Sequence, residues 1–431
     1  MNQKFPNDKV TCISPWYELR VNADGSMTYC HGATKNTKEK TDLNFHEWFN
    51  HGNMPTEVRE SITSGVKYPG CANCYYNESL NLISHRQRRN NQGAIYDGPY
   101  FYESVLQSPT YKRLTNEVKN RYPAFLHVTL SNLCNLKCRM CFPEFSSQLS
   151  SAYQKIGWMK STDPVLLDWT QDEVKWNNFL EFIKSNNNIM SLHFMGGEPL
   201  YHKKFHDFIE WCVANEKTDY YLSFVTNGTI YDQQLIEKLK YFREVHIEIS
   251  VENLHPSSDY IRIGSNYQTI KDNILRIKDD VGSNVVIVLR TVPQALSVEH
   301  YHTIIDFALE NNFGFDNNVL SNPRHLKCNV LPNAYKKEIA AAMRDKYTTI
   351  LSMDSSSIIH QVAMTRSSTL ISIKKEIESI IARLEEPEPD DVENLRKKFI
   401  DHNIQLDKFS ELKFKEIYPK LIHFYEKYSS V

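Results

Sequence analysis

The sequence has no long apolar run. Its longest convincing one, Val285 to Leu289, is far shorter than the roughly 20 residues that a membrane-spanning helix needs. The stretch from Met1 to Val10 is polar and contains Pro6, so it does not have the form of a signal peptide. These absences favour a cytoplasmic protein that has no membrane partner.

The sequence also lacks a charge excess of either sign. Its 50 lysines and arginines nearly balance 52 aspartates and glutamates, which leaves a net charge of −2. That balance excludes a globally basic nucleic-acid binder and an acidic disordered protein, so we expect no nucleic-acid partner. With 41% apolar residues over 431 positions, the chain can bury a sizeable core and has the length of two or three domains.

Cysteine is scarce, and the odd total of nine argues against a disulfide framework. In a reducing cytoplasm, clustered cysteines more often hold metal than form disulfides. Cys212 matches no motif and is expected in the core. Seven of the nine lie in the first third of the chain: Cys12, Cys30, Cys71, Cys74, Cys134, Cys138 and Cys141.

The middle of the chain alternates between predicted strands and helices. Stretches typical of strands are 126–130, 191–195, 221–225, 246–251 and 284–292, with helical patterns such as 205–212, 233–241 and 298–309 between them. This alternation is typical of βαβ units and a parallel sheet. Five or six units over residues 123–330 predict an α/β fold, a partial (β/α)6 barrel of the TIM type with its chemistry at the carboxyl ends of the strands.

Residues 1–95 form a small, loop-rich module. Strands at 17–21 and 26–29 flank a turn at Asp24-Gly25, which would bring Cys12 near Cys30. The basic run 85–89 is interpreted as a solvent-facing side of a helix, with a substrate or anion contact as the alternative.

Residues 96–122 are predicted to be a linker, and residues 331–431 a helical segment. An acidic, proline-broken stretch at 385–391 interrupts that segment. One apolar helix face is predicted before it, at Ile373, Ile377, Ile380, Ile381 and Leu384.

Cys134-x3-Cys138-x2-Cys141 follows the first strand of the predicted barrel. Three thiolates on one short loop can hold three corners of a cubic iron–sulfur cluster, which leaves the fourth iron open to a ligand. At the cysteine frequency of this chain, roughly 0.004 matches to this spacing are expected by chance. Buried or zinc-bound thiols are the alternative interpretation.

Residues 132–141, Asn-Leu-Cys-Asn-Leu-Lys-Cys-Arg-Met-Cys, resemble the signature of the radical S-adenosylmethionine (SAM) superfamily. The resemblance implies a [4Fe–4S] cluster on Cys134, Cys138 and Cys141, the catalytic residues, whose open iron chelates SAM. One electron from the cluster would cleave SAM to a 5′-deoxyadenosyl radical, and the radical would abstract hydrogen from a substrate. Such chemistry needs an electron donor such as flavodoxin or ferredoxin.

Further motifs resemble the SAM-binding positions of that family, and most of them lie at the ends of predicted strands. Gly196-Gly197-Glu198-Pro199 resembles the GGEP motif, whose backbone and carboxylate receive the SAM amino group; a plain turn is the alternative. The remaining implied contacts are Thr226 and Asn227 beside SAM, Ser250 and Glu252 toward the ribose and sulfonium, and Arg262 toward the SAM carboxylate. The alternative interpretation of Ser250 is a cap at the end of its strand, and that of Arg262 is a surface ion pair.

Cys12, Cys30, Cys71 and Cys74 suit a closed zinc site or a four-cysteine iron–sulfur cluster. Their surroundings resemble the auxiliary-cluster module called SPASM or twitch in a short, one-cluster form, which implies a second, auxiliary [4Fe–4S] cluster. His31 stands where relatives often have another cysteine, and the module precedes the barrel. The matching features are Pro15-Trp16, the Asp24-Gly25 turn, Cys71-Ala72-Asn73-Cys74 and Ser84-His85-Arg86.

The resemblance covers about residues 10–330 and predicts a radical SAM enzyme. SPASM and twitch enzymes often oxidise or cross-link a peptide or protein, which is the first hypothesis for the substrate. Radical modification of a small molecule, such as a sugar, nucleotide or amino acid, is the second, because the sequence shows no separate peptide-binding domain. The third hypothesis, a non-catalytic iron–sulfur or zinc protein, is disfavoured by the intact cysteine motif and Glu198.

Overall fold

The computed structural model describes residues 10, 12–34, 38–42, 44–79, 84–92, 122–353 and 368–429. An open eight-stranded sheet with the order β10-β9-β7-β6-β5-β3-β1-β2 forms its centre. Neighbouring strands run parallel except for β2, which pairs antiparallel with β1. The strands are β1 (Glu18–Val21), β2 (Met27–Thr28), β3 (Phe125–Val128), β5 (Ser191–Phe194), β6 (Tyr221–Thr226), β7 (Glu244–Ser250), β9 (Val285–Thr291) and β10 (Gly314–Asn317).

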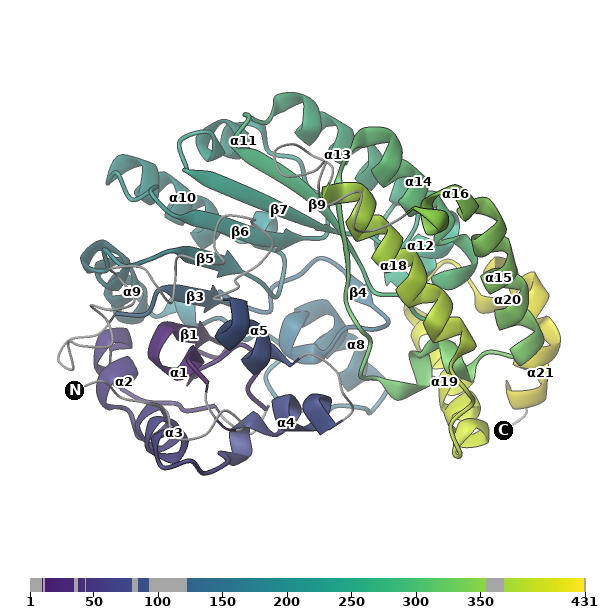
Figure 1. Cartoon of the computed structure of the whole chain (residues 1–431), viewed down its shortest axis with the longest axis horizontal. Helices are drawn as coiled ribbons and strands as arrows, with labels where there is room; N and C mark the ends of the chain where they lie inside the picture. Colours follow the sequence, from purple (N-terminus) through teal and green to yellow (C-terminus); the bar gives the residue numbers. More distant parts are fainter. Residues whose placement is uncertain are drawn as a thin grey trace.

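The described helices lie around this sheet (Figure 1). In the first part of the chain they are α1 (Ser14–Tyr17), α2 (Phe45–His51), α3 (Asn53–Thr63), α4 (Ala72–Ser79) and α5 (His85–Gln92). Along the central strands they are α8 (Ser147–Lys155), α9 (Glu173–Ser185), α10 (Lys203–Ala214), α11 (Gln233–Leu239), α12 (Pro256–Ile261), α13 (Tyr267–Asp280) and α14 (His302–Asn311). The last part holds α15 (Asn333–Lys346), α16 (Thr348–Ser352), α18 (Ser368–Glu385), α19 (Val392–Leu406), α20 (Phe414–Ile417) and α21 (Ile422–Ser429).

The predicted strands and intervening helices are confirmed. The six strands β3, β5, β6, β7, β9 and β10 are the parallel strands expected of a partial (β/α)6 barrel. Local side chains fix where several outer helices begin, because Asp172, Asp232 and Asn266 each accept a hydrogen bond from a backbone N–H in the first turn of α9, α11 and α13. The helix starts are therefore encoded in the loops that follow the strands.

The two faces of the sheet differ in chemistry. Phe194 of β5 packs its ring 5.2 Å from the rings of both Phe205 and Phe208 of α10, so this face meets the outer helices. His193, its neighbour in the strand, lies on the opposite face, where its Nδ1 is 2.6 Å from Ser223 Oγ. Barrel interiors are usually filled with Val, Ile and Leu. A polar inner face therefore suits a fold that encloses a polar ligand.

The N-terminal module is joined to the central sheet through backbone hydrogen bonds. The predicted hairpin is confirmed as β1 and β2, and β1 pairs in parallel with β3, with Glu18 opposite Phe125 and Val21 opposite Val128. Gly25 has a φ of 75° in the turn between the hairpin strands, a conformation that suits glycine. The module thus extends the sheet at its β3 edge.

The C-terminal helices cover the other edge of the sheet (Figure 1). α18 packs on β10 and on α15, and the five apolar side chains predicted for its buried face are all buried. α18 ends at Glu385 and α19 begins at Val392, so the acidic stretch 385–391 separates the two helices as predicted.

None of the described helices is long and apolar enough to cross a bilayer. The predicted linker 96–122 lies outside the described residues except for its last position, Tyr122.

Candidate active site

The three clustered cysteines lie on a loop that follows β3. Cys138 belongs to β4 (Lys137–Cys138), which pairs antiparallel with β8 (Arg262–Ile263) so that Cys138 is opposite Arg262. Cys134 and Cys138 are buried, and Cys141 is half-buried. The loop brings three thiols to the carboxyl ends of the parallel strands, where the fold predicts chemistry.

The glycines after β5 allow the backbone to approach the cysteine loop closely. A Cβ atom on Gly197, whose φ is 59°, would lie 2.7 Å from the carbonyl oxygens of both Ser131 and Leu133. The next residue, Glu198, donates its N–H to the Leu133 carbonyl at 2.8 Å. Only glycine fits this contact, so the Gly-Gly-Glu-Pro turn and the cysteine loop form one unit.

The Glu198 carboxylate is held at the end of β6. Its oxygens accept hydrogen bonds from Thr226 Oγ1 at 2.8 Å, the Asn227 N–H at 2.6 Å and the Leu200 N–H at 3.0 Å. Burial raises the pKa of Glu198 to about 7, and these hydrogen bonds oppose that rise. Since a carboxylate has roughly four acceptor positions, one is left for a ligand.

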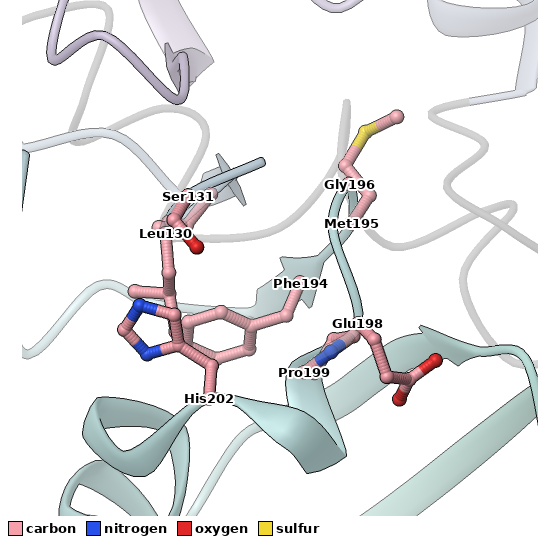
Figure 2. A pocket seen from close by; sticks show the side chains of 9 residues that line it. Leu130, Ser131, Phe194, Met195, Gly196, Glu198, Pro199 and His202 are labelled. Atoms are coloured by element: carbon pink, nitrogen blue, oxygen red, sulfur yellow. The ribbon is translucent and has the colours of Figure 1, made fainter. Parts of the chain in front are cut away.

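A small cavity lies behind the Gly-Gly-Glu-Pro turn, and Figure 2 shows the Glu198 carboxylate turned away from the His202 ring. The cavity contacts the apolar side of the strand ends, and it contains none of the three cysteines. Its lining residues are Val128, Leu130, Ser131, Phe194, Met195, Gly196, Glu198, Pro199 and His202.

Asn227 connects the end of β6 to the cysteine loop. Its Nδ2 donates to Asn135 Oδ1 at 2.8 Å and lies 4.0 Å from Cys134 Sγ. Through Asn227 and Glu198, the ends of β5 and β6 both contact residues of the loop. The structure therefore gathers the predicted residues Gly196, Gly197, Glu198, Thr226 and Asn227 beside Cys134.

Arg262 is buried and paired, so the surface ion pair proposed as its alternative is wrong. Its Nη2 donates to Glu252 Oε1 at 2.6 Å, and its Nη1 donates to Cys138 Sγ at 3.6 Å. Glu252 in turn accepts the Val292 N–H at 2.9 Å. The β4–β8 pairing brings Arg262 inside, which sequence position alone does not reveal. Ser250 is half-buried at the last position of β7.

The surroundings of the thiols fit an iron–sulfur cluster. Besides Arg262, the Leu136 N–H lies 3.5 Å from Cys134 Sγ, and N–H donors to sulfur are a regular means of tuning such clusters. Burial, then the charge of Cys138, raises the pKa of Cys134 to about 12, and burial also raises the pKa of Cys138 and Cys141. Three thiolates this close together, two of them buried and one half-buried, therefore need a positive metal centre.

Arg139, between the cysteines, is a site residue that the sequence did not reveal. Its side chain is completely buried, with Nη2 2.6 Å from Asp407 Oδ1 and Nη1 3.1 Å from the Asn403 carbonyl oxygen. Its guanidinium carbon lies 3.7 Å from the Tyr260 ring centre, and His402 Nε2 lies 2.9 Å from its carbonyl oxygen. The C-terminal helix α19 thus holds the cysteine loop from outside the sheet.

Two buried amides past the ends of β7 and β9 were also missed. Both polar side-chain atoms of Gln294, and Nδ2 of Asn253, have no hydrogen-bond partner although both residues are completely buried. Buried polar atoms are normally satisfied by protein, ligand or water. In the sequence, the only indication of these two buried amides is their position just past strand ends, Asn253 after Glu252 and Gln294 shortly after Val292.

The four module cysteines are buried together. Burial raises the pKa of Cys12 to about 12 and that of Cys71 to about 11. The charges of neighbouring thiolates add to this, because Cys71 raises the pKa of Cys12 and Cys74 raises the pKa of Cys71. Burial, then the charge of Glu18, raises the pKa of Cys30 well above its ordinary value, and Cys12 and Cys74 add to this rise. The predicted proximity of Cys12 and Cys30 is therefore confirmed.

Arg86 and Arg89 of the basic run 85–89 are buried, so its interpretation as a solvent-facing helix side is wrong for these two residues. Arg89 pairs with Glu18, which is completely buried, and Arg86 Nη2 lies 2.6 Å from Glu78 Oε2. Burial acts to raise the pKa of Glu18, but Arg89 and His85 hold it well below its ordinary value. These arginines are inside because they compensate carboxylates next to the cysteines.

A single ion does not match the spacing of the module thiols. With Zn–S bonds of about 2.3 Å, tetrahedral sulfur ligands lie roughly 3.8 Å apart. Among the described residues, the one group of three potential ligands whose atoms all lie within 4.8 Å is Glu18, Cys30 and His85. Because Arg89 and His85 already compensate Glu18, that group needs no ion. The wider spacing of the four thiols suits a larger centre.

Comparison with known proteins agrees with the geometry. Residues 128–308 match the model of the Radical SAM superfamily. The chain is 27% identical over 226 residues to the radical SAM cyclopropyl synthase TigE of Paramaledivibacter caminithermalis, covering 51% of this chain and 45% of TigE. It is 32% identical over 116 residues to molybdenum cofactor biosynthesis protein 1 of Dictyostelium discoideum, covering 27% of this chain and 16% of that protein. The chain thus spans less than half the length of each of these relatives.

Solved structures with a similar chain course include anSMEcpe with bound AdoMet, at a TM-score of 0.38 and 17% identity over 52% of this chain and 60% of that one. Another is Streptococcus suis SuiB bound to its precursor peptide SuiA, at a TM-score of 0.37 and 17% identity over 77% of this chain and 70% of that one. The superfamily match extends from the end of β3 into α14, and so includes the strand ends that gather around Cys134, Cys138 and Cys141. The chain therefore carries a radical SAM domain over residues 128–308.

Proposed function

We propose that the protein cleaves SAM reductively and uses the resulting 5′-deoxyadenosyl radical to abstract hydrogen from a substrate. The observation that carries this proposal is the convergence of three thiols, two buried and one half-buried, with the glycine turn packed on their loop. Cys134, Cys138 and Cys141 would hold a [4Fe–4S] cluster, which supplies the electron for SAM cleavage when bound.

The residues at the strand ends would bind and orient SAM. Glu198 has one acceptor position left for the SAM ammonium, while its other hydrogen bonds keep the ends of β5 and β6 together. Arg262 is already matched by Glu252, so we assign it to the cluster side of the site, where its donor to Cys138 sulfur offsets negative charge. Gly196, Gly197, Thr226, Asn227, Ser250 and Glu252 complete the proposed SAM-binding set.

We further propose that Cys12, Cys30, Cys71 and Cys74 hold an auxiliary [4Fe–4S] cluster, in a twitch-type module over residues 1–95. Their common burial, their wide spacing and the N–H of Gly32, 3.2 Å from Cys30 Sγ, support a cluster over zinc. Such a cluster could accept the electron that remains after hydrogen abstraction. The barrel would then occupy residues 123–330 and the helical segment 331–431.

For the substrate, we propose a peptide or protein, as is frequent among enzymes with SPASM and twitch modules. The similarity to a molybdenum cofactor biosynthesis protein supports the second candidate, a small molecule. Flavodoxin or ferredoxin would be the electron donor.

Anaerobic reconstitution tests the proposal. With both clusters in place, the protein should bind about eight irons per chain and release 5′-deoxyadenosine from SAM after reduction. Screening candidate peptides against sugars, nucleotides and amino acids should reveal the substrate as the compound that increases 5′-deoxyadenosine release. An iron-loaded protein that never cleaves SAM would reject the enzymatic proposal.

A further inference from the structure

A row of polar side chains crosses the inner face of the sheet, opposite the face that meets α10. Within it, His193 is close to Ser223, and Arg290 Nη1 lies 3.0 Å from Glu248 Oε2. Arg290 Nη2 also lies 3.0 Å from Asp316 Oδ2. Most of this polar row is therefore paired internally. Its members, from β1 to β10, are Arg20, His127, His193, Ser223, Glu248, Arg290 and Asp316. Strand register aligns the first four with one another and the last two with each other, and Glu248 joins the two sets through its contacts with His193 and Arg290.

Arg20 is the exception, at the β1 end of the polar row. Its guanidinium makes one hydrogen bond, from Nη1 to the His31 carbonyl oxygen at 3.3 Å, while its Nε is buried without a partner. Within the described part of the chain, no carboxylate oxygen lies within 4.0 Å of it, because Glu18 on the same strand is paired with Arg89. The Nε–Nη2 edge, which can bind a carboxylate with two parallel hydrogen bonds, is thus unused by the residues that the structure describes.

Two imidazoles beside this guanidinium also have unpaired ring nitrogens. The His31 and His127 rings are stacked with their centres 4.7 Å apart, and Nδ1 of each is buried without a hydrogen-bond partner among the described residues. His127 is only 3% exposed, and it is the Cα partner of Arg20 across the β1–β3 pairing. Buried nitrogens of this kind are normally satisfied. Together with Nε of Arg20, these two imidazole nitrogens make three unsatisfied nitrogens close to one another, which indicates a ligand with acceptor oxygens.

We propose that Arg20, His31 and His127 bind a carboxylate group of the substrate. This inference rests on the proposed function and makes it more specific. His31 follows Cys30 of the module, whereas His127 lies on β3, which leads into the cysteine loop. A substrate anchored there would be held between the two groups of cysteines.

The local charges favour a carboxylate over a phosphate. Arg20 contributes one positive charge that no described carboxylate balances, and burial lowers the pKa of His127, so this imidazole donates without adding charge. Two carboxylates, Glu18 and Glu248, lie near the same face. A single negative charge balances the guanidinium, whereas a phosphate dianion would leave excess negative charge beside these carboxylates.

Calorimetric titration of the full-length, iron-loaded protein with alanyl-alanine, its C-terminal amide and inorganic phosphate tests the site. We expect the wild-type protein to bind the free dipeptide but neither the amide nor phosphate. Arg20→Gln should weaken dipeptide binding by roughly 10- to 150-fold, the range for hydrogen bonds to a charged group. Arg20→Lys should weaken it less, because lysine keeps the charge and loses only the two-pronged geometry.

Arg243→Gln is the matched control, since this arginine is 47% exposed and lies outside the polar row. Equal affinity for dipeptide and amide, preference for phosphate, no heat of binding with the wild-type protein, or unchanged binding in Arg20→Gln would each overturn the proposal. If Arg20→Gln fails to load iron, equal dipeptide affinity of Arg20→Lys and the wild-type protein overturns it instead. Dipeptide binding without SAM cleavage would support the carboxylate site and reject the proposed radical chemistry. SAM cleavage without dipeptide binding would support the chemistry and reject the carboxylate site.

Discussion

The two cysteine groups are built in opposite ways. Cys134, Cys138 and Cys141 are close in sequence, but distant parts of the chain, including Arg262 and Asp407, hold their loop. The module cysteines lie between positions 12 and 74, and Cys12, Cys30 and Cys71 pack in one apolar cluster that is built mostly from residues of the module. Cysteines that are close in sequence therefore reveal a metal site easily, but their spacing does not show which distant residues stabilise it. Widely spaced cysteines are harder to recognise as one site, but the segment between them contains most of the residues that stabilise it.

Removing the close group should have the largest effect. Replacing Cys134, Cys138 and Cys141 together with alanine should abolish SAM cleavage and remove about half of the iron, four of roughly eight atoms. Cys212→Ala is the control, because Cys212 is buried in α10 away from both groups. Iron analysis and a 5′-deoxyadenosine assay measure both outcomes, and full iron loading in the triple variant would refute the assignment.

Cys30→Ala should separate the two groups. Because the cysteines proposed to hold the SAM-cleaving cluster lie elsewhere, the variant should lose one cluster yet still release 5′-deoxyadenosine, while turnover of the substrate should be lost. Electron paramagnetic resonance and iron content follow the clusters. Zinc in the wild-type module, or normal substrate turnover by the variant, would make the module a structural element rather than a redox centre.

Glu18→Gln tests whether the module depends on its own buried charges. Breaking the pair with Arg89 leaves a buried guanidinium unmatched, which costs about 3–5 kcal/mol. We expect this loss in urea unfolding, together with faster removal of the auxiliary iron by a chelator. Glu60→Gln on the exposed side of α3 should change neither measurement. Faster loss of the other cluster instead would contradict the separation of the two groups.

Asp407→Asn tests the C-terminal support of the close group and should have the smallest effect. Arg139 keeps its bonds to Asn403 and its contact with Tyr260, so we expect a loss of about 2 kcal/mol, the value of one charged hydrogen bond. Iron bound by the Cys134 loop should then be chelated faster, and auxiliary iron at the normal rate. Asp401→Asn, on the exposed side of α19, is the control. If the Cys134 loop loses iron equally fast in Asp407→Asn and Asp401→Asn, the Arg139–Asp407 pair does not stabilise the loop.

The sequence predicted what local patterns determine. Alternating strands and helices, the hairpin before Cys30 and the buried face of α18 follow from short-range periodicity, and all are present. The burial of Arg86 and Arg89 could not be predicted, because it depends on carboxylates that only the fold brings near. Arg139 was missed for the same reason, since its partner Asp407 is 268 positions away.

The polar row was hidden for a further reason. Each of its members looks like one polar residue in one strand, and the row exists only when the strands are aligned. A charged residue in a strand of a parallel sheet is nevertheless a signal, because such strands are usually apolar on both faces. Arg20 and Arg290 could have been recognised by that rule.

The pairing of β1 with β3 has a consequence for how the molecule avoids aggregation. A strand at the border of a sheet exposes backbone groups that can recruit other chains, and natural proteins keep such borders short or covered. Here one border is β2, only two residues long, and the other strand at a border, β10, is covered by α18. A shortened protein that begins at residue 123, just before β3, would expose the whole length of that strand. We expect that fragment to self-associate, so the N-terminal hairpin also acts as a solubility guard for the domain it adjoins.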